Sequence, residues 1–296
     1  MTLALASPPP STAPDAADPD ATALQRARGI VRLGFVADAD GATRLTTLYQ
    51  AGAGKARLPR APAGAPPLAV LLNTAGGLTG GDKFLTEVSI GDGAAAVVTT
   101  QAAERVYRRL TGTARVETRL TVGRGARLSW LPQETIVFDG AGLERSLDVS
   151  IGAGAQFIAC EAIVLGRAAM GETVRTVEVR DRWDITIDGR LVFADRLRLV
   201  GDAEAILAGP ATGGGARAFA TLVLAGAGAA ERLDAVRGAI EAAVTAVGGG
   251  VEAGASALDG VVVARLIASS ATPLRVTLAR LLAALEGRPL PRVWSC

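Results

Sequence analysis

The apolar residues of this chain recur in short runs that follow Gly-x-Gly pairs. Three runs share one order, a β-forming residue, glycine, any residue, glycine and alanine before an apolar stretch: SIGDGAAAVVTTQ from Ser89, TVGRGARLSWLPQ from Thr121 and SIGAGAQFIACEA from Ser150. Glycine turns a corner with positive φ at little steric cost, and the alanine leaves room for a neighbouring unit. Copies spaced about 30 residues apart are typical of stacked units. The pattern predicts a mainly β fold, a β-helix-like solenoid body of many short strands.

Equivalent positions of stacked units lie side by side. The polar residues ten positions after the first glycine, Gln101 and Gln133, are therefore predicted to form a row, with Glu161 one position off it. The alternative is that glycine-rich turns recur by chance in a chain with 36 glycines.

Hairpins are predicted where an Asp-Gly pair lies between two strand-forming runs, at Asp40-Gly41, Asp188-Gly189 and Asp259-Gly260. The continuous apolar run LAVLLNTA from Leu68 predicts a strand that is buried on both faces. The basic, proline-rich segment before it, KARLPRAPAGAPP, predicts a loop.

Two C-terminal helices are predicted where apolar residues recur at intervals of three and four. The first covers residues 230–247 and ends at the glycines that begin with Gly248. The second has a stripe of leucines, Thr272 as its cap, Pro273 at its first position and Gly287 as its stop. We expect a disordered tail at 1–25, since its Pro, Ala, Ser, Thr and Asp content suits neither a core nor a signal peptide. A single domain would then cover 26–296, with a β body at 26–225 and a helix-containing part at 226–296.

Composition excludes several classes of function. The chain has no histidine, which rules out a His-based triad, a His-containing zinc site and an imidazole proton shuttle. Its net charge of +2 gives no basic surface for nucleic acid. The longest uncharged apolar run, 218–230, is too short to span a bilayer. Cys160 and Cys296 are too few for a disulfide framework. We expect a cytoplasmic protein that binds neither nucleic acid nor membrane.

The segment GGLTGGD, from Gly76 to Asp82, contains two Gly-Gly pairs, which suggests backbone brought close to something. A phosphate-binding loop would end in Lys-Ser/Thr, but here Lys83 and Phe84 follow the aspartate. A structural turn and a loop that faces a partner or handles an ion both remain open.

Five acidic residues are candidates for chemistry: Asp82, Glu134, Asp139, Glu161 and Glu172. Each taken singly is most simply a surface or turn residue, but three of them lie at similar places in adjacent repeats. A pair of carboxylates suits glycoside hydrolysis, which needs no histidine. A β-helical carbohydrate-active enzyme is therefore an alternative function. The aromatic content of 4% weakens it, because sugar-binding clefts normally supply stacking faces.

The same residues carry a family resemblance. GGLTGGD, TTQAAERVYR, LPQETIVFDGA, the Cys160-Glu161 pair with LGRAAMGE, RDRWDITIDGRLVFADRLRL and the closing RVW resemble the urease accessory protein UreD family, called UreH in some organisms. The resemblance covers roughly Ile30 to the C-terminus. It implies a non-catalytic scaffold, not an enzyme, with a β-rich stacked fold and two helices. Such a scaffold would dock on the urease apoprotein, bind UreF and through it the GTPase UreG, and help nickel reach the urease active site.

The family is associated with an internal route for the metal, lined by polar and acidic residues. The resemblance implies that this route includes residues of the quoted motifs: Asp82, Glu134, Asp139, Glu161 and Glu172. Tightly held nickel is commonly bound by imidazole or thiolate, whereas oxygen ligands hold it weakly. We therefore expect no stably bound cofactor, only nickel in transit. The sequence departs from the family pattern in two places. Thr79 stands where the glycine motif often has valine, and a long tail precedes Ala23.

Overall fold

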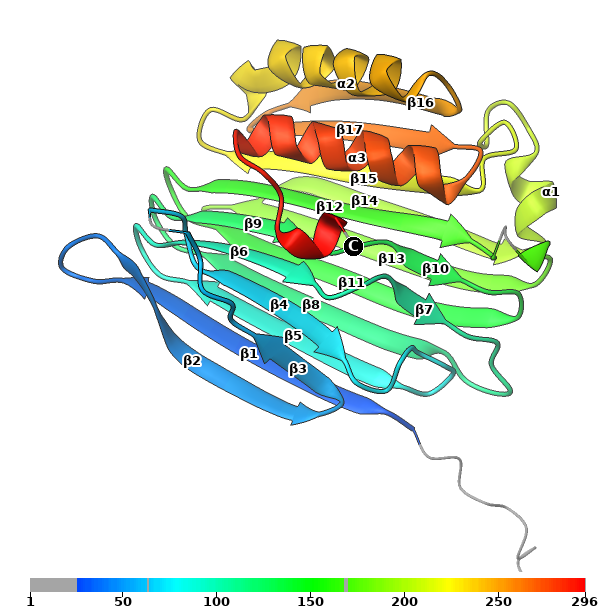
Figure 1. The fold of residues 1–296 in the computed structure, drawn as a ribbon, viewed down its shortest axis with the longest axis horizontal. Coiled ribbons are helices and arrows are strands. Elements are labelled where there is room, and N and C mark those ends of the chain that lie inside the picture. The colour runs from blue at the N-terminus through cyan, green and yellow to red at the C-terminus, as the bar shows by residue number, and fades with distance from the viewer. Residues whose placement is uncertain (1–25, 63, 168–169, 296) are drawn as a thin grey trace, which may run out of the picture.

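The structure, a computed structural model, describes residues 26–62, 64–167 and 170–295. Its core is built from two β-sheets, shown in Figure 1. Sheet A contains, in spatial order, β14 (Arg190–Gly201), β13 (Val177–Ile187), β11 (Ala141–Ile151), β8 (Ala114–Val122), β5 (Lys83–Ile90), β1 (Arg28–Ala37) and β2 (Thr43–Gly52). Sheet B runs through β16 (Val251–Leu258), β17 (Val261–Ala268), β15 (Ala218–Gly226), β12 (Gln156–Leu165), β9 (Arg127–Leu131), β6 (Ala95–Thr100), β4 (Leu68–Asn73) and β3 (Gly54–Arg57).

Three rungs connect the two sheets. Each passes from sheet A to sheet B, as β5 to β6, β8 to β9 and β11 to β12, and each strand pairs in parallel with the equivalent strand of the next rung. The predicted stacked, solenoid-like body with C-terminal helices is confirmed. Two short strands, β7 (Glu104–Val106) and β10 (Thr135–Val137), were not predicted, and they form a parallel side stack against β12.

The two glycines of each corner have different tasks. The second glycines take a positive φ, 69° at Gly93 and 61° at Gly125, as the corner requires. At the first glycine the neighbouring rung comes too close for a side chain: a Cβ on Gly123 would lie 2.7 Å from the backbone nitrogen of Asp92. The alanine that follows is buried in each rung, at Ala94, Ala126 and Ala155.

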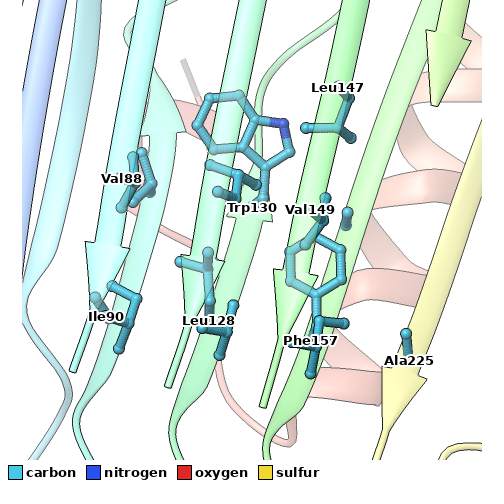
Figure 2. Close-up of a cluster of buried hydrophobic side chains, with 14 of the residues drawn as sticks. Val88, Ile90, Leu128, Trp130, Leu147, Val149, Phe157 and Ala225 are labelled. Carbon is cyan, nitrogen blue, oxygen red and sulfur yellow. The ribbon is translucent and has the colours of Figure 1, made fainter. Parts of the chain in front are cut away.

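The space between the sheets is filled by apolar side chains from both. Figure 2 shows this cluster, with residues of sheet A facing residues of sheet B: Val88, Ile90, Leu147 and Val149 opposite Leu128, Trp130, Phe157 and Ala225. Alternate residues of each strand supply the contacts because successive side chains point to opposite faces of a sheet.

Both predicted C-terminal helices are present, α2 (Leu233–Val247) and α3 (Ala271–Glu286). They cover the outer face of sheet B beside β15, β16 and β17, where a second apolar cluster fills the contact. The predicted start of the second helix was wrong by two residues. Its N-cap is Ser270, which has an extended backbone (φ −158°, ψ 171°) and lies two residues after the end of β17, and Thr272 lies inside the helix. Pro273 is accommodated because first-turn N–H groups have no intrahelical partner.

The three Asp-Gly hairpins are confirmed as β1–β2, β13–β14 and β16–β17. The loop predicted over KARLPRAPAGAPP is wrong at its start, where Lys55–Arg57 belong to β3, because they pair with β4. A short helix, α1 (Ala203–Leu207), was missed although Asp202 caps it. The predicted tail 1–25 and Cys296 lie outside the described residues. Within the described part of the chain, every helix is too short or too polar to cross a membrane.

Candidate functional site

A cavity of about 360 Å³ opens between the two sheets. At its mouth lie exposed residues of the loops that follow β4 and β6, among them Thr74 and Gln101. At its inner end lie the buried side chains of Arg145 and Glu161. Apolar and polar residues share its wall, and the uncharged polar ones are Asn73, Thr74, Thr86, Thr100, Gln101, Thr118, Gln133 and Thr135. The predicted row of Gln101, Gln133 and Glu161 therefore lies along one cavity.

A buried polar layer closes the inner end of this cavity. It consists of Arg145 on β11, Asp181 on β13 and Glu161 on β12, which are 7, 8 and 9% exposed. Arg145 and Asp181 are directly paired in the register of sheet A, and Glu161 faces them from sheet B. The guanidinium donates through Nη2 to Asp181 Oδ2 at 2.5 Å, and through Nη1 to Glu161 Oε2 and to Thr135 Oγ1.

The alternation of the strands explains why these three residues meet. On β11 the inward neighbours of Arg145 are Leu143 and Leu147, which belong to two different apolar clusters. The polar layer therefore interrupts the apolar interior between those clusters. Trp130 lines the same site and donates from Nε1 to Glu161 Oε1 at 3.3 Å. The hydrogen bonding of the layer is incomplete, since Arg145 Nε and Asp181 Oδ1 are buried and find no partner among the described residues.

Burial sets the electrostatics of the cavity. It raises the pKa of the Glu161 carboxyl above its ordinary value, and the charge of Arg145 opposes this only in part. It likewise raises the pKa of Glu104, nearer the mouth, where Asn73 donates to the carboxylate. Burial alone would lower the pKa of Arg145, but the charges of Asp181 and Glu161 raise it above its usual range. The arginine is therefore a permanent cation at the inner end.

Asp82, the acid of the glycine motif, is buried in the loop that it closes. Its Oδ1 accepts from the backbone nitrogen of Ala27 at 2.7 Å, and its Oδ2 accepts from that of Thr79 at 2.8 Å. These contacts favour the structural turn among the alternatives for GGLTGGD.

Asp139 and Glu172 lie together in a second group, which we call the loop-end cluster and which also includes Arg108 and Arg167. Asp139 Oδ1 accepts from the backbone N–H groups of Arg175 and Thr176, and its Oδ2 pairs with Arg108 at 2.7 Å. Glu172 accepts from the Asp139 N–H at 3.1 Å and pairs with Arg167 at 2.8 Å.

Both carboxyls of the loop-end cluster have lowered pKa values. The Thr176 N–H is the main cause of the lowered pKa of Asp139. Partial burial by itself raises the pKa of Glu172, but the hydrogen bonds from Arg167 and from the Asp139 N–H leave it below its ordinary value.

Glu134 lies on the helix side of sheet B. Its carboxylate pairs with Arg275 of α3 at 2.7 Å, and that arginine also lies over the ring of Trp294. The indole of Trp294 is buried and donates to Thr99. The five predicted acids thus occupy four places, and only Asp139 and Glu172 are in contact. Among the residues that the structure describes, no three His, Cys, Asp or Glu side chains come together as a metal site.

Comparison with known proteins decides the family. A model of the family described as UreD urease accessory protein matches residues 27–295. This chain belongs to the UreD family. A protein named urease accessory protein UreD from Methylobacterium sp. (strain 4-46) is 51% identical over 271 residues, which are 92% of this chain and 95% of that protein. The protein of the same name from Mesorhizobium japonicum is 46% identical over 272 residues, with the same coverage of the two chains.

Another UreD relative, from Rhizobium leguminosarum bv. trifolii, is 48% identical over 257 residues, 86% of this chain and 91% of that protein. The resemblance drawn from the motifs is therefore confirmed. In this UreD-family chain, sequence reasoning missed two members of the polar layer, Arg145 and Asp181. Each lies at an inward position of a strand that is otherwise apolar on that face, at Leu143, Leu147, Val179 and Trp183. The signal available in the sequence was a charged residue at an alternating position where the other residues of the strand are apolar.

Proposed function

We propose that this chain is a non-catalytic scaffold for urease maturation that binds the urease apoprotein and the UreF and UreG accessory proteins, and that nickel passes through its interior. The names of its relatives support the accessory role. The observation that carries the nickel route is the cavity between the sheets, which leads from exposed loops to the buried carboxylate of Glu161. Its wall offers hydroxyl, amide and carboxylate oxygens, which hold such a cation weakly and suit passage.

A carbohydrate-active enzyme is less well supported. Glu161 and Asp181 share one guanidinium and Asp181 does not line the cavity, so these two carboxylates are not presented together to a sugar. Of the five acids implied by the resemblance, Glu161 alone lines the cavity. We therefore take it as the first residue to test for the nickel route, with Asp82, Glu134, Asp139 and Glu172 as further candidates.

The test uses co-expression of urease with this chain and its accessory proteins. Glu161→Gln is expected to lower the nickel content of purified urease while UreF still co-purifies with the variant, because the change keeps the side-chain volume. The matched control is Glu144→Gln. Glu144 is on the same strand as Arg145 but faces outward, where its half-exposed carboxylate pairs with Arg115 at 3.2 Å.

Nickel content equal to wild type in the Glu161 variant would refute the route through this cavity. Failure of the wild-type chain to co-purify with a UreF partner or with urease apoprotein would refute the scaffold itself. Metal analysis of urease and co-purification thus test the two parts of the proposal separately.

A further inference from the structure

The inner end of the cavity is blocked by a side chain that carries a positive charge. Arg145 lines the cavity wall, as does Glu161, whereas Asp181 is not part of the wall and is hydrogen-bonded to the guanidinium. For a positively charged cargo this is an unexpected place for an arginine. The same guanidinium is what holds the two carboxylates in position, one on each terminal nitrogen.

Two features show that Arg145 alone does not satisfy the carboxylates of Glu161 and Asp181. One positive charge faces two carboxylates, so the layer carries one negative charge in excess when all three groups are ionised. In addition, Asp181 Oδ1 and Arg145 Nε are buried and have no hydrogen-bond partner in the part of the chain that the structure describes. Buried charges are stable when they are paired and buried polar atoms when they are hydrogen-bonded. A divalent cation would match the charge of the pair and could also use the free oxygen of Asp181.

The cavity offers room for the arginine to move. The cavity that Arg145 lines has a volume of about 360 Å³, and the polar side chains of Gln133 and Thr118 lie on its wall. The Nη1 contact with Thr135 Oγ1, at 3.2 Å, is already directed to a residue of that wall.

We propose that Glu161 and Asp181 form a binding site for a divalent transition-metal cation, and that Arg145 occupies this site as a built-in substitute cation. This inference rests on the proposed nickel route. When the guanidinium swings into the cavity, the metal takes its place between the two carboxylates. When it returns, it displaces the metal. The metal can bind only those molecules in which Arg145 has left the site. Its apparent affinity is therefore reduced in proportion to the fraction of such molecules, and binding stays transient.

The test measures binding of NiCl₂ to the isolated full-length chain by calorimetric titration, without urease. Arg145→Met removes the competing charge and keeps an unbranched side chain. It is expected to bind one nickel ion per chain at least about tenfold more tightly than wild type, because the site is then always open. Adding Asp181→Asn to this variant is expected to abolish the gain. The control Arg198→Met removes an exposed arginine on the opposite face of sheet A and should behave as wild type.

Equal nickel affinity of wild type and Arg145→Met would overturn the proposal. A gain that survives Asp181→Asn would do so as well, since the metal would then be bound elsewhere. Thermal unfolding provides a second readout: nickel should raise the Tm of Arg145→Met more than that of wild type.

If Arg145→Met does not fold, Arg145→Lys is the deciding variant. A single ammonium cannot reach both carboxylates as the guanidinium does, so this variant should bind nickel more tightly than wild type. Unchanged affinity in Arg145→Lys would then overturn the proposal. These outcomes are independent of urease, so a negative result would leave the scaffold role standing, and loss of the scaffold role would leave the binding result intact.

Discussion

The polar layer inside the cavity and the loop-end cluster use the same residue types in opposite ways. In the polar layer, the hydrogen-bond partners of Glu161 within the described residues are the side chains of Arg145 and Trp130, and burial raises its pKa. In the loop-end cluster, Asp139 and Glu172 accept from backbone N–H groups and exposed arginines, and their pKa values are lowered. Acids that hold backbone donors at a turn are part of the fold, whereas acids buried against one arginine leave a site that another cation can enter.

Breaking the polar layer should have the largest effect on stability. Arg145→Met leaves two buried carboxylates without their counter-charge, and removal of one partner from a buried ion pair typically costs about 3–5 kcal/mol. We expect a loss of that order in the free energy of unfolding, measured by urea denaturation without metal.

The triple variant Arg145→Met/Glu161→Gln/Asp181→Asn sharpens this expectation. It removes all three charges at once, so it should be more stable than the single variant, since no buried charge is left unpaired. If the single and triple variants were equally destabilised, loss of packing would explain the effect and the electrostatic account of the layer would be wrong.

Breaking the loop-end cluster should cost less. Asp139→Ala leaves the backbone N–H groups of Arg175 and Thr176 without their acceptor, but this region is partly open to water, which can replace it. We expect about 1–2 kcal/mol, as for the loss of a capping side chain. The control is Asp148→Ala, which removes an ion pair with Arg182 on the outer face of sheet A and should cost less than about 1 kcal/mol. The urea midpoints of the two variants show which substitution costs more stability. A larger loss from Asp148→Ala than from Asp139→Ala would contradict the structural role that we assign to Asp139.

Local features of this molecule could be predicted from its sequence, whereas contacts between distant strands could not. The rungs were predictable because Gly-x-Gly corners are local signals, and the helices because their apolar stripes are periodic. Glu161 was found through its place in the third repeat. Arg145 and Asp181 were not, because their meeting depends on the register of β11 against β13 and on how the two sheets face each other. Neither property is encoded in a short segment. The family resemblance placed the acids of the loop-end cluster on a nickel route, which stays a prediction, and only coordinates show that Asp139 holds a turn.

The two regions should change the pH dependence of stability in opposite directions. This is the smallest of the expected effects. Asp139 and Glu172 have folded-state pKa values below their ordinary 3.8 and 4.5, so their contribution is present above those values and is lost as the pH falls through the folded ones. Glu161 has a raised pKa, so its contribution is present below 4.5 and is lost as the pH rises through the folded value.

Measurements of Tm between pH 7 and pH 3.5 should therefore show opposite changes in two variants. On acidification Asp139→Asn should lose less Tm than wild type, because it lacks a group that destabilises the fold in acid. Glu161→Gln should lose more, because it lacks a group that becomes more favourable there. Parallel curves for the two variants would contradict the assignment of raised and lowered pKa values to the two regions. Curves that diverge as expected would tie the sign of each shift to burial in the cavity and to backbone donors at the loop ends.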